Sequence, residues 1–124
     1  MSKIFLFSGS LFGASAVMLG AFAAHALKAR LDPNQLAAFQ TGVQYQMIHA
    51  LVLLIVAVLL ERQVSQLLGF AGFAFILGIV LFCGSLYLLT LTGMRWPGPI
   101  TPLGGLAFIA GWLMLALQKH GNDQ

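Results

Sequence analysis

Residues 63–94 read QVSQLLGFAGFAFILGIVLFCGSLYLLTLTGM, a run of 32 positions without a charged side chain. A membrane-spanning helix needs about 20 apolar residues, so this run is long enough to cross a bilayer. Three further uncharged runs occupy residues 4–27, 33–60 and 96–118, and they are 24, 28 and 23 residues long. The six basic and three acidic residues therefore mark the ends of four predicted spans.

The composition excludes a secreted or cytosolic enzyme. Of the 124 residues, 60% are hydrophobic and 7% are charged, whereas about a quarter of a soluble domain is charged. The mean hydropathy is +0.94, and the length suits one domain. The predicted fold class is all-α: a polytopic membrane protein that forms a four-helix bundle.

The charge pattern argues against a nucleic-acid partner, and the cysteine count excludes an intramolecular disulfide. The net charge is +3, and the basic residues are solitary and lie at span ends, as is typical of cations that seek lipid headgroups. Recognition of nucleic acid needs a basic patch on one face, so no nucleic-acid partner is expected. Cys83 is the only cysteine in the sequence, which excludes an intramolecular disulfide.

The predicted spans are about 4–26, 43–60, 66–91 and 100–117, all within one domain, 1–124. Asp32 suits an N-cap and Pro33 a first helical position, so a helix should begin before span two as an interfacial lead-in, either continuous with that span or bent near Gly42. Prolines delay the last helix until about Ile100. The first apolar run imitates a signal peptide, but its length of about 20 residues exceeds the usual 7–15 and favours a retained span.

Small residues recur along the spans and predict close approach between helices. In span one they follow each other every three or four positions and form a groove along one helical face. The opening of span four is similarly rich in glycine. The residues assigned to helix packing are Gly9, Gly13, Gly20, Gly84, Pro102, Gly104 and Gly105.

Four spans place both termini on one side of the membrane, face one. Face two is the opposite side, which holds the link after span one and the loop before span four. Each face carries three Lys or Arg residues, so the positive-inside rule selects no orientation. A fixed orientation and dual topology with antiparallel dimers both stay open.

Polar residues gather near face two, and we expect all four spans to bring them to the same membrane level. Polar groups inside a span are costly unless they are paired, which makes them functional candidates. One interpretation is a small-molecule or proton site, and the other is interhelical hydrogen bonding that holds the bundle together. The candidate residues are His25, Tyr45, Gln46, His49, Ser85, Tyr87, Arg95 and Thr101.

No catalytic constellation or metal site is predicted. No Asp or Glu lies within a span, so neither a Ser–His–Asp arrangement nor a carboxylate-based proton pump is favoured. His25 and His49 could ligate haem or a metal ion, but neither is clearly deep, and only Asp32 could supply a nearby carboxylate. No cofactor is therefore assigned.

Four motifs resemble those of one family. They are GAFAAHA at residues 20–26, YQMIHAL at 45–51, FCGSLY at 82–87, and TPLGG at 101–105 with Trp112. The chain resembles the domain-of-unknown-function 423 family (UPF0382) of small bacterial inner-membrane proteins, which is related to the eukaryotic transmembrane protein 256.

The resemblance covers almost the whole chain. It implies four membrane helices and a multi-pass location in the bacterial inner (plasma) membrane, but no activity. One departure is Ala23, where the family often has glycine. Carried over by position, the resemblance singles out His25, His49, Ser85, Tyr87, Pro102 and Gly105.

The sequence therefore predicts a non-enzymatic membrane protein that binds lipid or a partner protein and supports envelope integrity. Its expected partners are membrane lipids and either a second copy of the chain or another membrane protein. Two alternatives stay open: a transporter or channel component that works as an oligomer, and a haem- or quinone-binding redox module.

Overall fold

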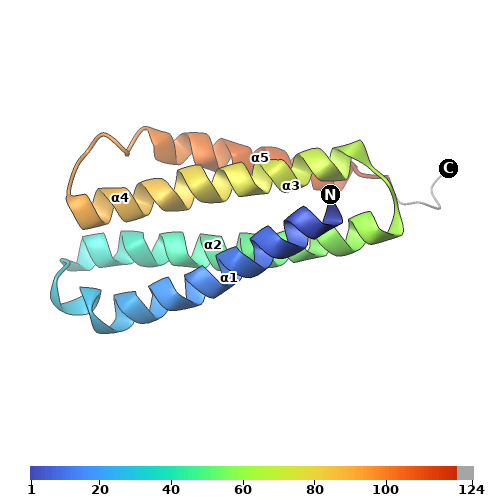
Figure 1. Cartoon of the computed structure of the whole chain (residues 1–124). Coiled ribbons are helices and arrows are strands. Elements are labelled where there is room, and N and C mark those ends of the chain that lie inside the picture. Colours follow the sequence, from blue (N-terminus) through green and yellow to red (C-terminus); the bar gives the residue numbers. More distant parts are fainter. Residues whose placement is uncertain (120–124) are drawn as a thin grey trace.

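A computed structural model of the protein describes residues 1–119. The helices are α1 (Ser2–His25), α2 (Pro33–Arg62), α3 (Gln66–Gly78), α4 (Gly84–Thr92) and α5 (Ile100–Leu117). A 3₁₀ turn, η1 (Leu27–Ala29), follows α1, and a π-helical segment, η2 (Ile79–Cys83), joins α3 to α4. Because α3, η2 and α4 continue along one axis, the chain forms four rods (Figure 1).

Each rod is long and apolar enough to cross a membrane, and the four candidate spans are Ser2–Ala29, Pro33–Arg62, Gln66–Thr92 and Ile100–Leu117. The predicted all-α fold with four transmembrane helices is confirmed. Met1 and the end of α5 lie at the same end of the bundle, as an even number of spans predicts (Figure 1).

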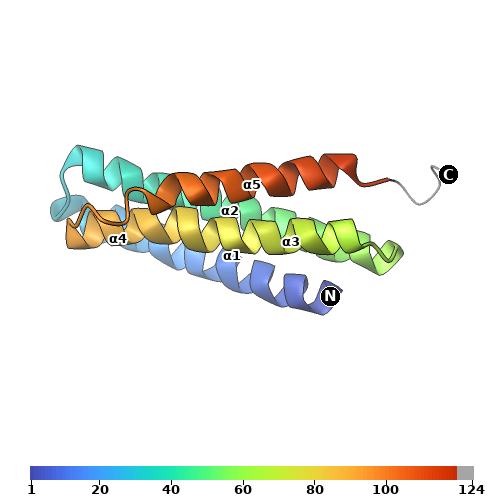
Figure 2. The same ribbon diagram turned by 90° about the horizontal axis from the view of Figure 1, so that it is seen from above.

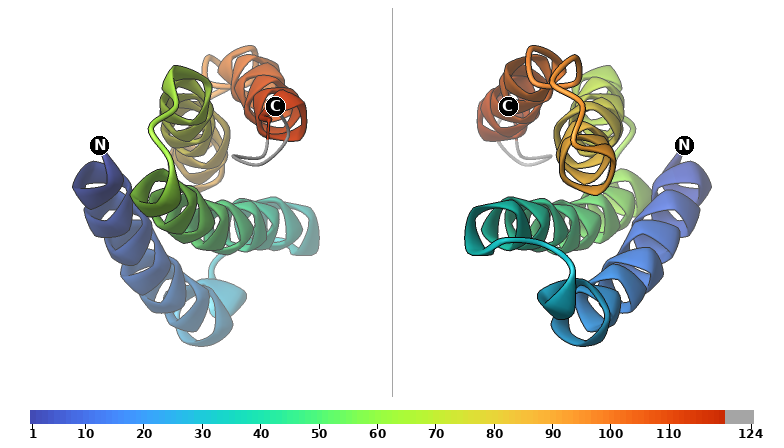
Figure 3. Two further views of the ribbon diagram at one scale, coloured as in Figure 1. Left: turned by 90° about the vertical axis from the view of Figure 1, so that its right-hand side faces the viewer. Right: turned by 90° about the vertical axis from the view of Figure 1, so that its left-hand side faces the viewer.

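The rods form two hairpins rather than a square bundle. α1 packs along α2, and α5 packs along α3 and η2. α2 also lies against the α3–η2–α4 rod and so joins the hairpins. α1 and α5 lie on opposite sides of the bundle, separated by α2 and that rod, both from above (Figure 2) and along the helices (Figure 3).

The start of α2 follows from local chemistry. The Asp32 side chain accepts from the Gln35 backbone N–H at 2.8 Å, and the Gln35 side chain accepts from the Asp32 backbone N–H at 3.2 Å. This capping box satisfies two amides that a helix start otherwise leaves unpaired. The predicted lead-in therefore begins at Pro33 and runs into span two as one helix, without a break at Gly42.

The core follows the central α2–α3 contact. One buried cluster is centred on Leu53, Val56 and Phe75, with Phe5 from α1 and Phe108 from α5. A smaller cluster of Ala23, Leu27 and Phe39 joins α1 to the start of α2. The lead-in is thus packed against α1 along one apolar side.

Glycines set the closest helix contacts. A Cβ built at Gly104 would lie 2.2 Å from the Phe82 backbone nitrogen, and one at Gly9 would lie 3.0 Å from the Ala50 carbonyl oxygen. Cβ atoms at Gly13, Gly20 and Gly105 would make ordinary contacts at 3.9, 3.4 and 4.0 Å.

Gly84 and Pro102 differ from their predicted packing role. A Cβ at Gly84 would meet no atom within 4 Å, so this glycine is not a close-contact point, and Pro102 is exposed in the first turn of α5. The π-helical segment beside Gly84 was not predicted. It inserts a wider turn into span three where Gly104 brings α5 against Phe82.

Candidate functional site

The eight predicted site residues do not form one cluster. The structure distributes them over a glutamine-centred hydrogen-bond clamp, a histidine–tryptophan pair beside an aromatic groove, and a hydroxyl bridge, and it leaves two residues apart from all three. Each group joins side chains from two or three helices.

The clamp is centred on Gln46, which is 3% exposed near the middle of α2. Its Nε2 donates to the Phe12 carbonyl oxygen at 2.9 Å and to Ser15 Oγ at 2.7 Å on α1. Its Oε1 accepts from the Tyr87 hydroxyl on α4 at 2.7 Å. One side chain therefore ties three helices together, and both amide N–H groups have partners.

His49 lies one turn further along α2 and is 4% exposed. Its Nδ1 lies 2.7 Å from the Tyr45 carbonyl oxygen, and Trp112 Nε1 on α5 donates to its Nε2 at 3.0 Å. The Phe108 ring stacks on the imidazole with centroids 3.7 Å apart and planes 11° apart. The sequence left the depth of His49 undecided, and the structure buries its side chain.

These partners select one state of the His49 ring. A carbonyl oxygen only accepts and an indole N–H only donates, so Nδ1 must carry the proton and Nε2 must carry the lone pair. A doubly protonated ring would turn an N–H toward the Trp112 N–H. The surroundings thus hold His49 as one neutral tautomer.

Ser85 and Thr101 form the hydroxyl bridge. Ser85 Oγ lies 2.9 Å from the Phe82 carbonyl oxygen, to which it can donate, and 2.5 Å from Thr101 Oγ1, with either hydroxyl able to donate to the other. This bridge joins α4 to the first turn of α5. Within residues 1–119, every buried side-chain nitrogen or oxygen has a hydrogen-bond partner.

His25 and Arg95 stand apart. Both are exposed, His25 at the end of α1 and Arg95 in the loop before α5. Gly20 of α1 lies level with Val43, so His25 lies nearer the start of α2, whereas His49 lies about 24 Å along the axis from Pro33. The expectation that His25 and His49 lie at one level is corrected: α2 begins well before residue 43, so His49 lies near the middle of the helix.

An aromatic groove opens between α2 and α5. Its volume is about 280 Å³. Tyr45, which is 40% exposed, packs its ring on Phe82 with centroids 4.7 Å apart. The groove lies on the outside of the bundle, where a membrane helix meets lipid. It is lined by Tyr45, His49, Phe82, Gly105, Phe108 and Trp112, among others.

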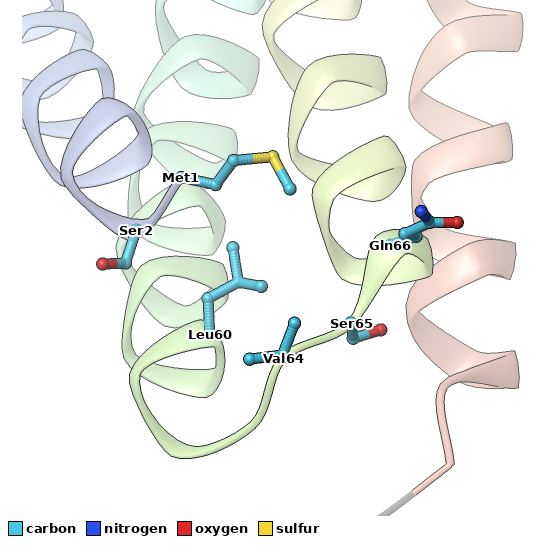
Figure 4. Close-up of a pocket in the computed structure, with 6 residues that line it drawn as sticks. All are labelled: Met1, Ser2, Leu60, Val64, Ser65 and Gln66. Atoms are coloured by element: carbon cyan, nitrogen blue, oxygen red, sulfur yellow. The ribbon is translucent and has the colours of Figure 1, made fainter.

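A second hollow, of about 230 Å³, lies at the end of the bundle that holds Met1 (Figure 4). The side chains of Met1, Leu60 and Val64 converge on it from α1, α2 and the following turn (Figure 4). Ser65 beside it donates to Gln118 Oε1 at 2.5 Å. This hollow is open at the turn after α2, and no charged side chain lines it.

Sequence reasoning missed Ser15, Phe82, Phe108 and Trp112 as parts of these groups. Gly105, Phe108 and Trp112 do share a helical face by their spacing, which was an available signal. Pairing that face with His49 required the rotation of α5 relative to α2. Across residues 1–119, no three His, Cys, Asp or Glu side chains are grouped to hold a metal ion.

Comparisons with known proteins agree with this architecture. The family described as "Protein of unknown function (DUF423)" matches residues 19–105. The UPF0382 membrane protein SH2409 of Staphylococcus haemolyticus is 44% identical over 93% of each chain. The UPF0382 membrane protein YwdK of Bacillus subtilis is 44% identical over 93% of this chain and 94% of its own.

A further relative is the UPF0382 inner membrane protein YgdD of Escherichia coli strain K12, which is 38% identical over 92% of this chain and 87% of its own. No solved structure shows a significant match. The relatives and the four apolar helices confirm the predicted multi-pass location in the bacterial inner membrane. The chain belongs to the UPF0382 (DUF423) family of membrane proteins.

Proposed function

We propose that this integral membrane protein is non-enzymatic, that it binds a membrane lipid in the groove between α2 and α5, and that this binding supports envelope integrity. The groove itself carries the proposal. It is concave, it is walled by aromatic side chains, and it opens sideways on helices that cross the membrane. Ligand sites are typically mostly apolar concavities of this kind with a few polar groups.

The state of the polar residues supports a binding role over a catalytic one. Gln46, His49 and Ser85 each spend their hydrogen-bonding groups on neighbouring helices or on their own backbone. A general base or nucleophile needs a free, activated group beside the substrate. These three side chains serve the bundle instead.

Transport and haem ligation receive less support. A transporter needs a polar path across the bilayer, whereas the clamp and the hydroxyl bridge are separate groups that join helices. Haem ligation through His49 would require Nε2 to leave Trp112, because Nδ1 already faces the Tyr45 carbonyl. Association with a second copy or with another membrane protein is compatible with lipid binding.

Native mass spectrometry tests the proposal. The protein is released gently from its own membrane as wild type, as Gly105→Leu and as Gly84→Leu. Position 105 lines the groove, and position 84 faces open space, so both variants add the same side chain. We expect a defined lipid mass on the wild type and on Gly84→Leu, and its loss from Gly105→Leu.

A bare chain or bare oligomer in all three samples would contradict lipid binding. Equal retention by Gly105→Leu would remove the groove as the site. For the envelope role, a deletion strain carrying Gly105→Leu should be as sensitive to detergent as the deletion itself. Resistance restored to the wild-type level by Gly105→Leu would separate the groove from envelope integrity.

A further inference from the structure

We propose that the groove binds a neutral, flat-ring lipid with a ring carbonyl, the chemistry of an isoprenoid quinone. This inference rests on the proposed lipid-binding function and names the class of lipid. It concerns binding alone and includes no electron transfer.

The rings that line the groove share an orientation. The planes of Tyr45, His49 and Phe108 lie within 26° of one another, with angles of 15° between Tyr45 and His49 and 11° between His49 and Phe108. Trp112 closes one end, with its ring at 72° to the imidazole. Aromatic pairs favour offset stacking, so a flat ring gains contacts here that a flexible acyl chain does not.

The groove is large enough for one ring. Gly105 supplies no side chain to the groove, and a Cβ there would still be 4.0 Å from the nearest atom, Phe82 Cδ2. An apolar cavity of about 150 Å³ holds a benzene ring. The groove, at about 280 Å³, therefore has room for one substituted ring, and a tail can leave through its open side.

The lining of the groove offers a hydrogen-bond donor but no charge. Within residues 1–119 the Tyr45 hydroxyl makes no hydrogen bond, so it offers a free O–H donor. Both His49 nitrogens are occupied, and the lining contains no charged side chain. A donor without a cation suits a carbonyl acceptor and gives no attraction for a phosphate headgroup.

Tryptophan fluorescence provides the test, because Trp112 lines the groove and quinones quench indole emission. A Trp96→Phe background leaves Trp112 as the sole tryptophan, since the chain has two. The purified protein in detergent is titrated with a decyl-tailed benzoquinone, and 1-decanol supplies the same tail without the ring. We expect saturable quenching by the quinone and no displacement of it by equal amounts of 1-decanol.

Three variants in that background make the result specific. Gly105→Leu should abolish the saturable phase, and Gly84→Leu should leave it unchanged. Tyr45→Phe should weaken binding about fivefold, which corresponds to one lost hydrogen bond. Circular dichroism checks that each variant is folded, and Gly105→Ala replaces Gly105→Leu if the larger side chain disturbs the helices.

The outcomes separate the two proposals. Quenching that is equal in Gly105→Leu and Gly84→Leu is collisional and overturns the quinone-type ligand. If 1-decanol removes the quenching at the concentrations at which the quinone binds, a ring is not required. That result overturns the quinone-type ligand and leaves the lipid-binding function standing. If neither compound binds and native mass spectrometry finds no retained lipid, both proposals fail.

Discussion

Two sides of α2, the one that faces α1 and the one that faces α5, differ in how they are closed. Toward α1, Gly9 brings the helix backbones together and Gln46 makes two hydrogen bonds across the contact. Toward α5, the Trp112–His49 hydrogen bond is the polar link, and an aromatic groove stays open beside it. The same helix thus has one sealed side and one side with room for a ligand.

This difference distinguishes two buried polar residues of α2. Gln46 and His49 are both buried and three residues apart, yet Gln46 faces the sealed contact and His49 faces the groove. A buried polar residue in a membrane helix is therefore best interpreted through the contact it faces.

The largest effect is expected for Gly104→Ala. Its Cβ would lie 2.2 Å from the Phe82 backbone nitrogen, and this clash can be relieved only by moving one helix away from the other. The free energy of unfolding should therefore fall by about 1–3 kcal/mol. Thermal unfolding in detergent measures the change. The neighbouring Gly105→Ala is the matched control and should change stability by less than about 0.5 kcal/mol. Equal losses in both variants would show that Gly104 is not a close-contact point.

The sealed contact is tested by Gln46→Leu. Three interhelical hydrogen bonds are lost, and such bonds average about 0.6 kcal/mol in membrane proteins, so the free energy of unfolding should fall by about 2 kcal/mol. Equilibrium unfolding in mixed detergent micelles gives the value. Gln44→Leu on the exposed side of α2 is the control. A Gln46→Leu variant as stable as Gln44→Leu would contradict the clamp.

The smallest effect is expected on the open side. Trp112→Phe keeps a ring but removes the donor to His49 Nε2, which should lower the free energy of unfolding by about 0.6 kcal/mol. Trp96→Phe in the exposed loop should leave it unchanged. Nitrogen NMR of wild-type His49 should show a protonated Nδ1 and an unprotonated Nε2. The opposite tautomer would contradict the assigned hydrogen bonds.

Features with a local cause were predictable from the sequence. The charged residues mark the four spans, the Asp32–Pro33 pair starts α2, and α5 begins at Ile100 after the prolines. Each depends on neighbours within about one helical turn. The site depends instead on how the helices are rotated and shifted relative to one another.

The histidines illustrate that limit. His25 and His49 were expected at one level because span two was taken to start at residue 43, but ten further residues of α2 precede that point, from Pro33. Trp112 has no polar pattern around it that identifies His49 as its partner. The π-helical segment at Ile79–Cys83 likewise has no signature in the apolar sequence that forms it.

The most direct measurement compares Gln46→Leu and Gly105→Leu in one native mass spectrometry experiment with stepwise heating. It reports unfolding and retained lipid for each molecule together. We expect opposite results. Gln46→Leu should unfold at a lower temperature and keep its lipid, while Gly105→Leu should unfold near the wild-type temperature and carry none. If each variant loses stability and lipid to the same degree, the sealed and open sides of α2 are not separate, and the account is wrong.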